Sequence, residues 1–201
     1  MRIIGFVGMP GSGKSVASEV ARKMGLTVVV MGDVIRKEAI RLQLEPTDEN
    51  LGQIGNLLRE MEGPTAIAQR TLEMARFLGG DIVIIDGLRS KAEVDFFRSN
   101  AEDFKLVEIC APHEARSKRI AIRGRSDDSN FQERNGTCEA KICGDKNNMS
   151  FQALERRESR EMGWGMHEAI EEADFRVSND GDIDAFRRSI QQALQYLISK
   201  I

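Results

Sequence analysis

The sequence has little that would suit a secreted or membrane-bound protein. It contains three cysteines among 201 residues, an odd number, and its first residues show no signal-like pattern, which favours a reducing interior over a disulfide scaffold. No apolar run approaches the roughly 18 residues that a helix needs to cross a bilayer. We therefore expect a cytoplasmic protein without membrane contact.

Neither sign of charge is in large excess, and we find no internal repeat or low-complexity tract. The 29 basic and 32 acidic side chains give a net charge of −3, whereas a general nucleic-acid binder is usually strongly basic. We therefore do not expect a nucleic-acid partner. An apolar share of 41% and a charged share of 30% are typical of a globular chain. A length of 201 residues suits one large domain or one domain with inserted lobes.

Residues 8–15 read GMPGSGKS and directly follow the apolar run RIIGFV. The segment has the GxxxxGK[ST] spacing of a phosphate-binding P-loop. In such a loop, small residues let backbone N–H groups turn toward an anion, and the next helix directs its positive end there. An accidental Gly-rich turn is the alternative, but the expected strand before and helix after argue against it. The sequence predicts a nucleoside triphosphate site formed by Gly8, Met9, Pro10, Gly11, Ser12, Gly13, Lys14 and Ser15, with the Ser15 hydroxyl as a Mg²⁺ ligand.

Short apolar runs alternate with helical patterns along the chain. The runs RIIGFVG, LTVVVM, DIVIID, FKLVEICA and DFRVSN are typical of strands buried in a parallel sheet. The helices between them predict βαβ units that cover both faces of the sheet. We therefore expect an α/β P-loop NTPase three-layer sandwich with a five-stranded parallel sheet. Ligands of such sheets bind at the carboxyl ends of the strands, expected at Gly8, Met31, Asp86, Ala111 and Ser178.

Two segments interrupt this alternation. Residues 33–80 are helical in pattern, with breaks at Pro46–Thr47 and Gly63–Pro64, and predict a helical insert. A polar, Gly- and Asn-rich stretch covers residues 126–150 and lacks core-forming side chains. We expect a lid over residues 124–160, with the whole chain forming one domain.

An aspartate and, three residues later, an arginine stand at the ends of two expected strands. These pairs are Asp33 with Arg36 and Asp86 with Arg89. Phosphoryl transfer needs cations around the phosphates and a carboxylate to orient the metal or the nucleophile, and Arg offers a planar fork for phosphate oxygens. A solvated surface charge is the alternative for any single arginine. The repetition at two strand ends favours a site, in which Asp86 would hold Mg²⁺ through water.

Arginine-rich helical segments flank the polar stretch. Arg116, Arg119 and Arg123 share one helix face, and Arg157 and Arg160 share another. Arginines at both bases of a lid can close over a polyphosphate and exclude water, which prevents hydrolysis. An exposed basic stripe is the alternative for the first group.

These motifs carry a family resemblance. The segments GMPGSGKS, GDVIR, IIDG followed by Arg89, Arg119 with Arg123, and RSDD at 125–128 together resemble adenylate kinases and other nucleoside monophosphate kinases. VSNDG near the carboxyl end looks more like dephospho-coenzyme A kinase. The whole pattern, with GDVIRKEA, DGLRS and REMGWGMHEAIEEADFRVSNDG, is most similar to a mainly archaeal family of adenylate kinase-related P-loop proteins.

For the ATP side, the resemblance implies that the β- and γ-phosphates with Mg²⁺ are held by Gly11, Gly13, Lys14 and Ser15. Arg119 would lie beside the base, and Arg123 would contact the phosphates. Asn179 to Gly181 would form the loop by the adenine.

For the acceptor side, the resemblance implies that Asp33, Arg36 and Arg89 belong to the acceptor site. Asp86 would sit near the metal. Arg157 or Arg160 would take the part of the late lid arginine.

The sequence departs from adenylate kinases at several positions. DGLR is one residue shorter than the usual DGFPR, so the reach of Arg89 is open. Glu93 stands where an adenine-reading Gln is usual, and a capping box with Ser90 accounts for it. Cys138 and Cys143 lie in an apparent insertion at 129–149. Free thiols are favoured there over a zinc site, which usually needs four ligands. For Trp164, a packing anchor for the lid helix is favoured over a base-stacking platform.

These features predict an ATP- and Mg²⁺-dependent kinase of a nucleotide or nucleotide-like small molecule, with AMP as the first candidate acceptor. If the acceptor is a hydroxyl, Asp33 would be the base, whereas a phosphate needs none. Two alternatives stay open: a dephospho-coenzyme A kinase-like enzyme, and a slow ATPase switch or assembly factor.

Overall fold

The computed structural model describes residues 1–123 and 146–200. Strands and helices alternate along this part of the chain. The strands are β1 (Arg2–Val7), β2 (Thr27–Val30), β3 (Ile82–Leu88), β4 (Phe104–Cys110) and β5 (Phe175–Ser178). The helices are α1 (Lys14–Lys23), α2 (Met31–Arg41), α3 (Asp48–Glu62), α4 (Ala66–Leu78), α5 (Lys91–Asn100), α6 (His113–Arg123), α8 (Lys146–Gly163), α9 (Met166–Glu171) and α10 (Ile183–Ile198).

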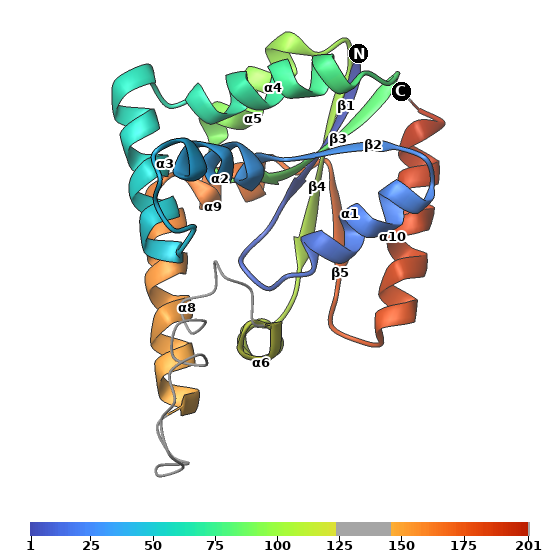
Figure 1. Cartoon of the computed structure of the whole chain (residues 1–201). Coiled ribbons are helices and arrows are strands. Elements are labelled where there is room, and N and C mark those ends of the chain that lie inside the picture. The colour runs from blue at the N-terminus through green and yellow to red at the C-terminus, as the bar shows by residue number, and fades with distance from the viewer. Residues whose placement is uncertain (124–145, 201) are drawn as a thin grey trace.

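The strands form one parallel sheet in the order β2-β3-β1-β4-β5 (Figure 1). β1 lies at its centre, where Ile4 pairs with Ile84 on one side and with Lys105 on the other. Each strand overlaps one of the apolar runs that predicted it. The expected five-stranded parallel sheet is confirmed in the described part of the chain.

Helices cover both faces of the sheet. Successive strand residues point to opposite faces, so Ile3 and Ile4, both fully buried, belong to different apolar clusters. The cluster around Ile3 includes side chains of α2, α3, α4, α5 and α9, and the cluster around Ile4 includes those of α1 and α10. The predicted three-layer α/β arrangement is therefore confirmed.

The third strand extends further than the sequence predicted. Asp86 was expected to end this strand, but β3 runs on to Leu88. The register with β1 shifts at this point, so Phe6 pairs with Asp86 and Val7 with Leu88. Gly87, skipped by the shift, has a φ of 101° that favours glycine. The shift lets Leu88 bury its side chain completely in the core.

The helical segment after β2 has its breaks where the sequence placed them. Thr47 caps α3 by accepting a hydrogen bond from the Asn50 N–H, and Gly63 ends that helix. Its first helix begins at Met31 instead of Asp33, so Asp33 lies within the first turn of α2. That this segment binds an acceptor stays a prediction.

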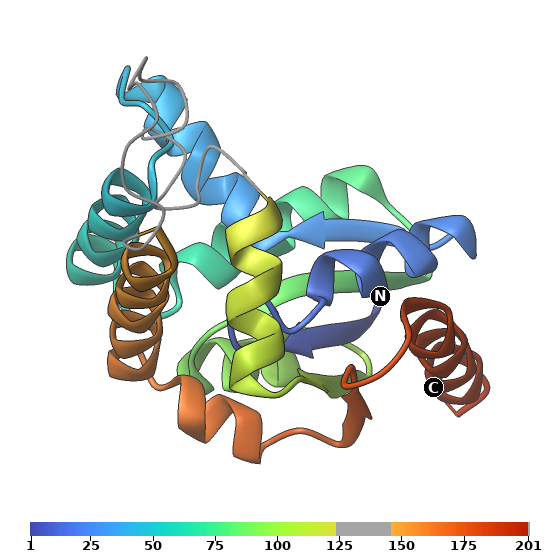
Figure 2. The ribbon, with the colours of Figure 1, turned by 90° about the horizontal axis from the view of Figure 1, so that it is seen from below.

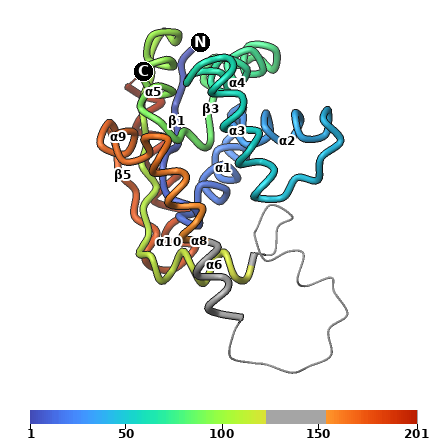
Figure 3. Tube along the Cα trace, turned by 90° about the vertical axis from the view of Figure 1, so that its left-hand side faces the viewer, coloured from blue at the N-terminus to red at the C-terminus, as the bar shows by residue number. Residues whose placement is uncertain are grey.

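Figure 2 looks onto the carboxyl ends of the strands, where α6 crosses the view and α8 lies beside α3. Figure 3 shows α8 running between α9 and α6, and both helices contact it. Of the predicted lid, residues 124–145 lie outside the described residues. Residues 146–160 belong to α8.

No helix within residues 1–123 and 146–200 combines the length and apolar character needed to span a membrane.

Candidate functional site

The P-loop connects β1 to α1, and at two of its positions the backbone leaves no room for a side chain. Gly8 and Gly13 have φ values of 147° and 117°, which L-residues rarely adopt. A Cβ on Gly8 would lie 2.2 Å from the Ile109 carbonyl oxygen, and one on Gly13 would lie 2.3 Å from Nδ2 of Asn179. Glycine is therefore required at both positions, and the loop keeps its backbone close to any ligand above it.

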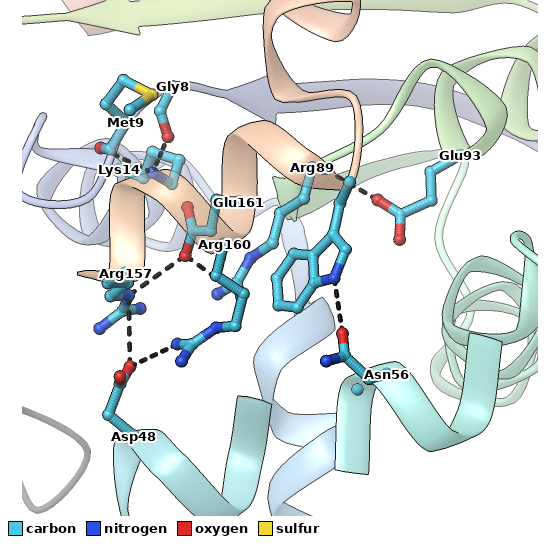
Figure 4. A network of polar contacts seen from close by, with 12 residues as sticks. Gly8, Met9, Lys14, Asp48, Asn56, Arg89, Glu93, Arg157, Arg160 and Glu161 are labelled. Atoms are coloured by element: carbon cyan, nitrogen blue, oxygen red, sulfur yellow. Dashed lines mark hydrogen bonds and ion pairs between the residues drawn. The ribbon is translucent and has the colours of Figure 1, made fainter. Parts of the chain in front are cut away.

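Lys14 opens α1 and folds back over the loop. Its Nζ donates hydrogen bonds to the carbonyl oxygens of Gly8 and, at 3.2 Å, Met9 (Figure 4). Burial lowers the pKa of the Lys14 ammonium to about 8, although the negative charges of Asp86 and Glu161 act in the opposite direction. A bound anion would oppose this loss of charge, because an adjacent negative charge favours the protonated form.

A cavity of about 420 Å³ brings most of the predicted site residues together. They come from the P-loop, α2, the end of β3, α6, α8 and the loop after β5. The predicted residues on its wall are Gly8, Pro10, Gly11, Gly13, Lys14, Ser15, Arg36, Asp86, Arg89, Arg119, Arg157 and Asn179. Segments far apart in the sequence therefore share one site at the carboxyl ends of the strands.

Several predicted residues lie off this cavity. Met9 packs against the apolar core, and Ser12 is buried beneath the loop. Asp33 is exposed, and Gly181 lies on the surface. None of these four lines the cavity, nor does Arg160, which lines a smaller cavity that shares Arg36, Arg89 and Arg157 with the larger one. Arg123 ends α6, and its side chain lies outside the described residues, as do Cys138 and Cys143.

Two oxygen-bearing side chains, Ser15 and Asp86, line the same cavity. Asp86 is 6% exposed, and its Oδ2 accepts a hydrogen bond of 2.7 Å from Oγ of Ser18, in the helix that also carries Ser15. Mg²⁺ prefers hard oxygen ligands and keeps several waters, so one hydroxyl and one carboxylate suit it. Within the described residues there is no group of three or more His, Cys, Asp or Glu that could hold a metal. Ser15 and Asp86 thus fit a magnesium ion that also binds phosphates.

The two Asp–Arg pairs differ in the structure. Nη1 of Arg36 donates to Oδ1 of Asp33 at 2.7 Å on the surface of α2. Arg89 instead lies 3.3 Å from Glu161 on α8. Burial lowers the pKa of the Arg89 guanidinium, and the charge of Glu161 acts against that change. Equal spacing in the sequence therefore did not produce equal partners.

Glu161 is a cavity residue that the sequence reasoning missed. Its side chain is 3% exposed and lies between Arg89 and Arg157. Burial alone would raise the pKa of its carboxyl, but the charges of Arg89, Arg157 and Lys14 outweigh burial and lower it. The i,i+4 spacing of Arg157 and Glu161 was a visible signal for an ion pair on α8, but it did not show that the pair faces the P-loop.

Asn179 and Arg119 hold the P-loop in place. Nδ2 of buried Asn179 donates to the Ser12 carbonyl at 2.7 Å. Nη2 of Arg119 donates to the carbonyl oxygen and to Oδ1 of Asn179 at 2.8 and 3.1 Å. Arg116, on the same helix, is 7% exposed and donates to the Pro10 carbonyl. Arg116 is therefore not part of an exposed basic stripe.

Trp164 and Glu93 both contact Arg59 of α3. The Trp164 Nε1 donates to Oδ1 of Asn56 at 2.7 Å, and the Arg59 guanidinium lies 4.4 Å from the indole ring centre. Trp164 thus joins the chain after α8 to α3. Oγ of Ser90 caps the Glu93 N–H as predicted. The Glu93 carboxylate, however, accepts from Arg89 N and Arg59 Nη2, both at 2.8 Å. Only the half of the expected capping box that joins Glu93 N–H to Ser90 forms, because the Glu93 carboxylate binds Arg59 and the Arg89 N–H instead of the Ser90 N–H.

Comparison with known proteins decides the family. The UPF0200 protein of Methanothrix thermoacetophila is 54% identical over 98% of both chains, and that of Methanosarcina mazei is 41% identical over 96% of this chain and 94% of its relative. The chain belongs to the UPF0200 family. A family model described as an AAA domain matches residues 7–133, more than half of the chain, so this UPF0200 protein also belongs to that domain family.

Solved structures of kinases share the fold. Shikimate kinase from Bacteroides thetaiotaomicron aligns with a TM-score of 0.57 at 18% identity, over 98% of each chain. A gluconokinase from Sinorhizobium meliloti aligns with a TM-score of 0.50 at 15% identity, over 98% of this chain and 93% of its own. This UPF0200 protein therefore has the α/β fold of P-loop kinases.

Proposed function

We propose that the protein is an ATP- and Mg²⁺-dependent phosphotransferase that moves the γ-phosphate of ATP to a nucleotide or nucleotide-like small molecule. AMP is the first candidate acceptor. The observation that carries this proposal is a single cavity that is lined both by the P-loop and by Arg36 and Arg89. A site for ATP alone would not need Arg36 of α2 and Arg89 just after β3, whereas a second anionic substrate would.

The chain's own groups would act by positioning and by neutralising charge. The P-loop N–H groups and Lys14 would bind the β- and γ-phosphates. Arg89 and Arg157, on the same cavity as Lys14, would hold the acceptor's anionic group, where their charges would also stabilise negative charge that develops during transfer. Ser15 and Asp86 would hold Mg²⁺, which neutralises phosphate charge when bound.

The position of Asp33 bears on the kind of acceptor. A hydroxyl acceptor needs a base near the reacting oxygen, but Asp33 lies off the cavity wall and pairs with Arg36. A phosphate acceptor needs no base. The geometry therefore supports an accepting phosphate, as in a nucleoside monophosphate.

Two other functions use the same site. The NDG segment and Asp33 favour a dephospho-coenzyme A kinase-like activity, but Asn179 uses its side chain to hold Ser12 and Arg119, and Asp33 does not line the cavity. An ATPase switch would use the P-loop without an acceptor.

The proposal also includes a cytoplasmic location and no nucleic-acid partner. The cysteine content supports the location, and the net charge of −3 supports the absence of a nucleic-acid partner.

The test is ADP formation from ATP and Mg²⁺, measured without an acceptor and with AMP, other nucleoside monophosphates and dephospho-coenzyme A in turn. Acceptor-dependent ADP together with a phosphorylated acceptor would support the kinase. Slow ADP formation at one rate under all conditions would favour the ATPase switch. Lys14→Ala is the control for a contaminating activity.

A further inference from the structure

A carboxylate of the chain itself lies against the cationic wall of the cavity. Oε1 of Glu161 is 3.1 Å from Nε of Arg157 and 3.3 Å from Nη1 of Arg89. Figure 4 shows Glu161 projecting from α8 between these two arginines and Lys14. Its side chain is 3% exposed, so few water molecules can shield its charge. Glu161 therefore lies where an anionic group of a ligand would find two guanidinium partners.

A second carboxylate continues this arrangement on α3. Oδ1 of Asp48 is 2.9 Å from Nη2 of Arg160 and 3.7 Å from Nε of Arg157. Asp48 lines the smaller cavity with four arginines, Arg36, Arg89, Arg157 and Arg160. The arginines of α8 are thus held by acids of the chain on both sides, and Arg157 lies between Asp48 and Glu161.

Buried guanidinium groups need a counter-ion, because an uncompensated charge away from water is costly. Arg89 and Arg157 also repel one another: after burial, the positive charge of Arg157 is a further cause that lowers the pKa of the Arg89 guanidinium. A carboxylate between the two arginines supplies the counter-ion and reduces their repulsion in the ligand-free protein. An incoming anion offers the same compensation, so it and Glu161 compete for the same N–H groups.

We propose that the Glu161 carboxylate occupies, in the ligand-free protein, the place of the acceptor's anionic group, and that Arg89 and Arg157 exchange Glu161 for that group on binding. Glu161 is then a specificity-determining residue that lowers the affinity of the site for any single anion. A ligand stays bound only if its other contacts compensate for displacing the carboxylate. The ligand class is a phosphate-bearing or carboxylate-bearing small molecule. This inference rests on the proposed function only for calling the ligand an acceptor.

If Glu161 supported anion binding instead of competing with it, its removal would change the anion affinity in the opposite direction. If Glu161 were a fixed support that aims Arg89 and Arg157 at a ligand, its removal would misplace them and weaken anion binding. If Glu161 is a competitor, its removal frees their N–H groups and strengthens anion binding. The sign of the change in affinity therefore separates the two roles, and a merely structural residue would not tighten binding.

The experiment measures the Kd of inorganic phosphate by calorimetry at about pH 8, where a phosphate group is mostly doubly ionised. No nucleotide is present, and the proteins are the full chain, Glu161→Gln and Glu155→Gln. Glu155 lies exposed on the same helix, so its variant controls for net charge. Glu161→Gln should bind phosphate about 10-fold more tightly, since hydrogen bonds to charged groups are worth this much or more. Glu155→Gln should bind like the native chain.

The double variant Glu161→Gln with Arg89→Ala locates the bound phosphate. The gain in affinity should disappear in it, because one of the two exchanged guanidinium groups is gone. Glu161→Asp keeps the negative charge but places it further from the arginines, so it should show a smaller gain in phosphate affinity. This variant replaces Glu161→Gln in the test if Glu161→Gln does not fold. Unchanged or weaker phosphate binding in Glu161→Gln, or a gain that persists without Arg89, would overturn the proposal. Because no turnover is measured, a protein without kinase activity could still pass this test.

Discussion

The side-chain amide of Asn179 donates a 2.7 Å hydrogen bond to the main-chain carbonyl of Ser12, from the opposite end of the chain. The same side chain would meet any Cβ on Gly13 at 2.3 Å. The loop after β5 therefore supports the P-loop directly, and the shape of the phosphate-binding backbone depends on a residue outside its own motif.

Replacing Asn179 should destabilise the protein and loosen the P-loop. Asn179→Ala leaves the Ser12 carbonyl with only a 3.5 Å contact from Nη1 of Arg119 and removes an acceptor of Arg119. This should lower the free energy of unfolding by about 1–3 kcal/mol. Urea unfolding measures this change. Asp180→Ala, at an exposed neighbouring position, is the matched control and should unfold like the native chain. Equal free energies of unfolding for the two variants would show that the Asn179 contact does not stabilise the fold.

The chain contains a single tryptophan, and its position should make it a reporter of acceptor binding. The ring centre of Trp164 lies 5.6 Å from the Arg89 and 5.7 Å from the Arg160 guanidinium carbon. A ligand that draws these arginines away changes the charge beside the indole. We expect the emission to change on adding the acceptor with ATP and to change less with ATP alone. Arg89→Ala should reduce the acceptor-induced change, and an unaltered signal in that variant would contradict this reading of the site.

The fold could be predicted from the sequence because its signals are local. The P-loop is a contiguous motif, the strands are contiguous apolar runs, and Thr47 and Ser90 cap the helices that follow them. Each of these features depends on residues a few positions apart. Patterns of this kind survive folding because the backbone itself imposes the 2- and 3.6-residue periods.

Much of the site could not be predicted, because its contacts join distant segments. Arg89 meets Glu161 only after β3 and α8 are brought together, and Arg160 meets Asp48 across 112 positions. The spacing of Asp86 and Arg89 suggested a pair, yet the register shift at Gly87 and the approach of α8 gave Arg89 another partner. Long ionic side chains choose among several neighbours according to tertiary placement, which a sequence pattern does not encode.

The stabilising effect of Glu161 should depend on pH. Its pKa is lower in the folded protein than the ordinary value of 4.5, so its contribution is complete above pH 4.5 and is lost as the pH falls through the lower folded value. The native chain should exceed Glu161→Gln in free energy of unfolding by about 1–3 kcal/mol at neutral pH, and the difference should shrink in acid. Unfolding curves of both proteins across this range measure it. A difference that stays constant or grows in acid would mean that the carboxylate is not held by positive charge.

Removing the P-loop lysine should separate binding from folding. Lys14→Ala should abolish ATP turnover and leave the Tm of the ligand-free protein nearly unchanged, because the hydrogen bonds from Lys14 to the Gly8 and Met9 carbonyls are offset by the cost of burying its ammonium. ATP should raise the Tm of the native chain by mass action and have little effect on the variant. Ordinary ATP affinity in a folded Lys14→Ala protein would remove the P-loop assignment.

Arg36 and Arg89 should be needed for the acceptor and not for ATP. Either alanine variant should weaken acceptor use by about 10²-fold, since a charge-assisted contact is worth ~1.5–3 kcal/mol and arginine contacts are often bidentate. Arg36→Lys should also be poor, because an ammonium cannot reproduce the planar fork. ATP affinity should change little, because the P-loop is unaltered.

The most direct test of the phosphotransferase assignment is acceptor-dependent ATP turnover in Arg36→Ala and Arg89→Ala, measured beside ATP affinity in the same preparations. We expect native ATP affinity with a loss of about 10²-fold in kcat/KM for the acceptor. Turnover equal to that of the native chain, whichever acceptor is supplied, would contradict it and leave an ATPase without a second substrate.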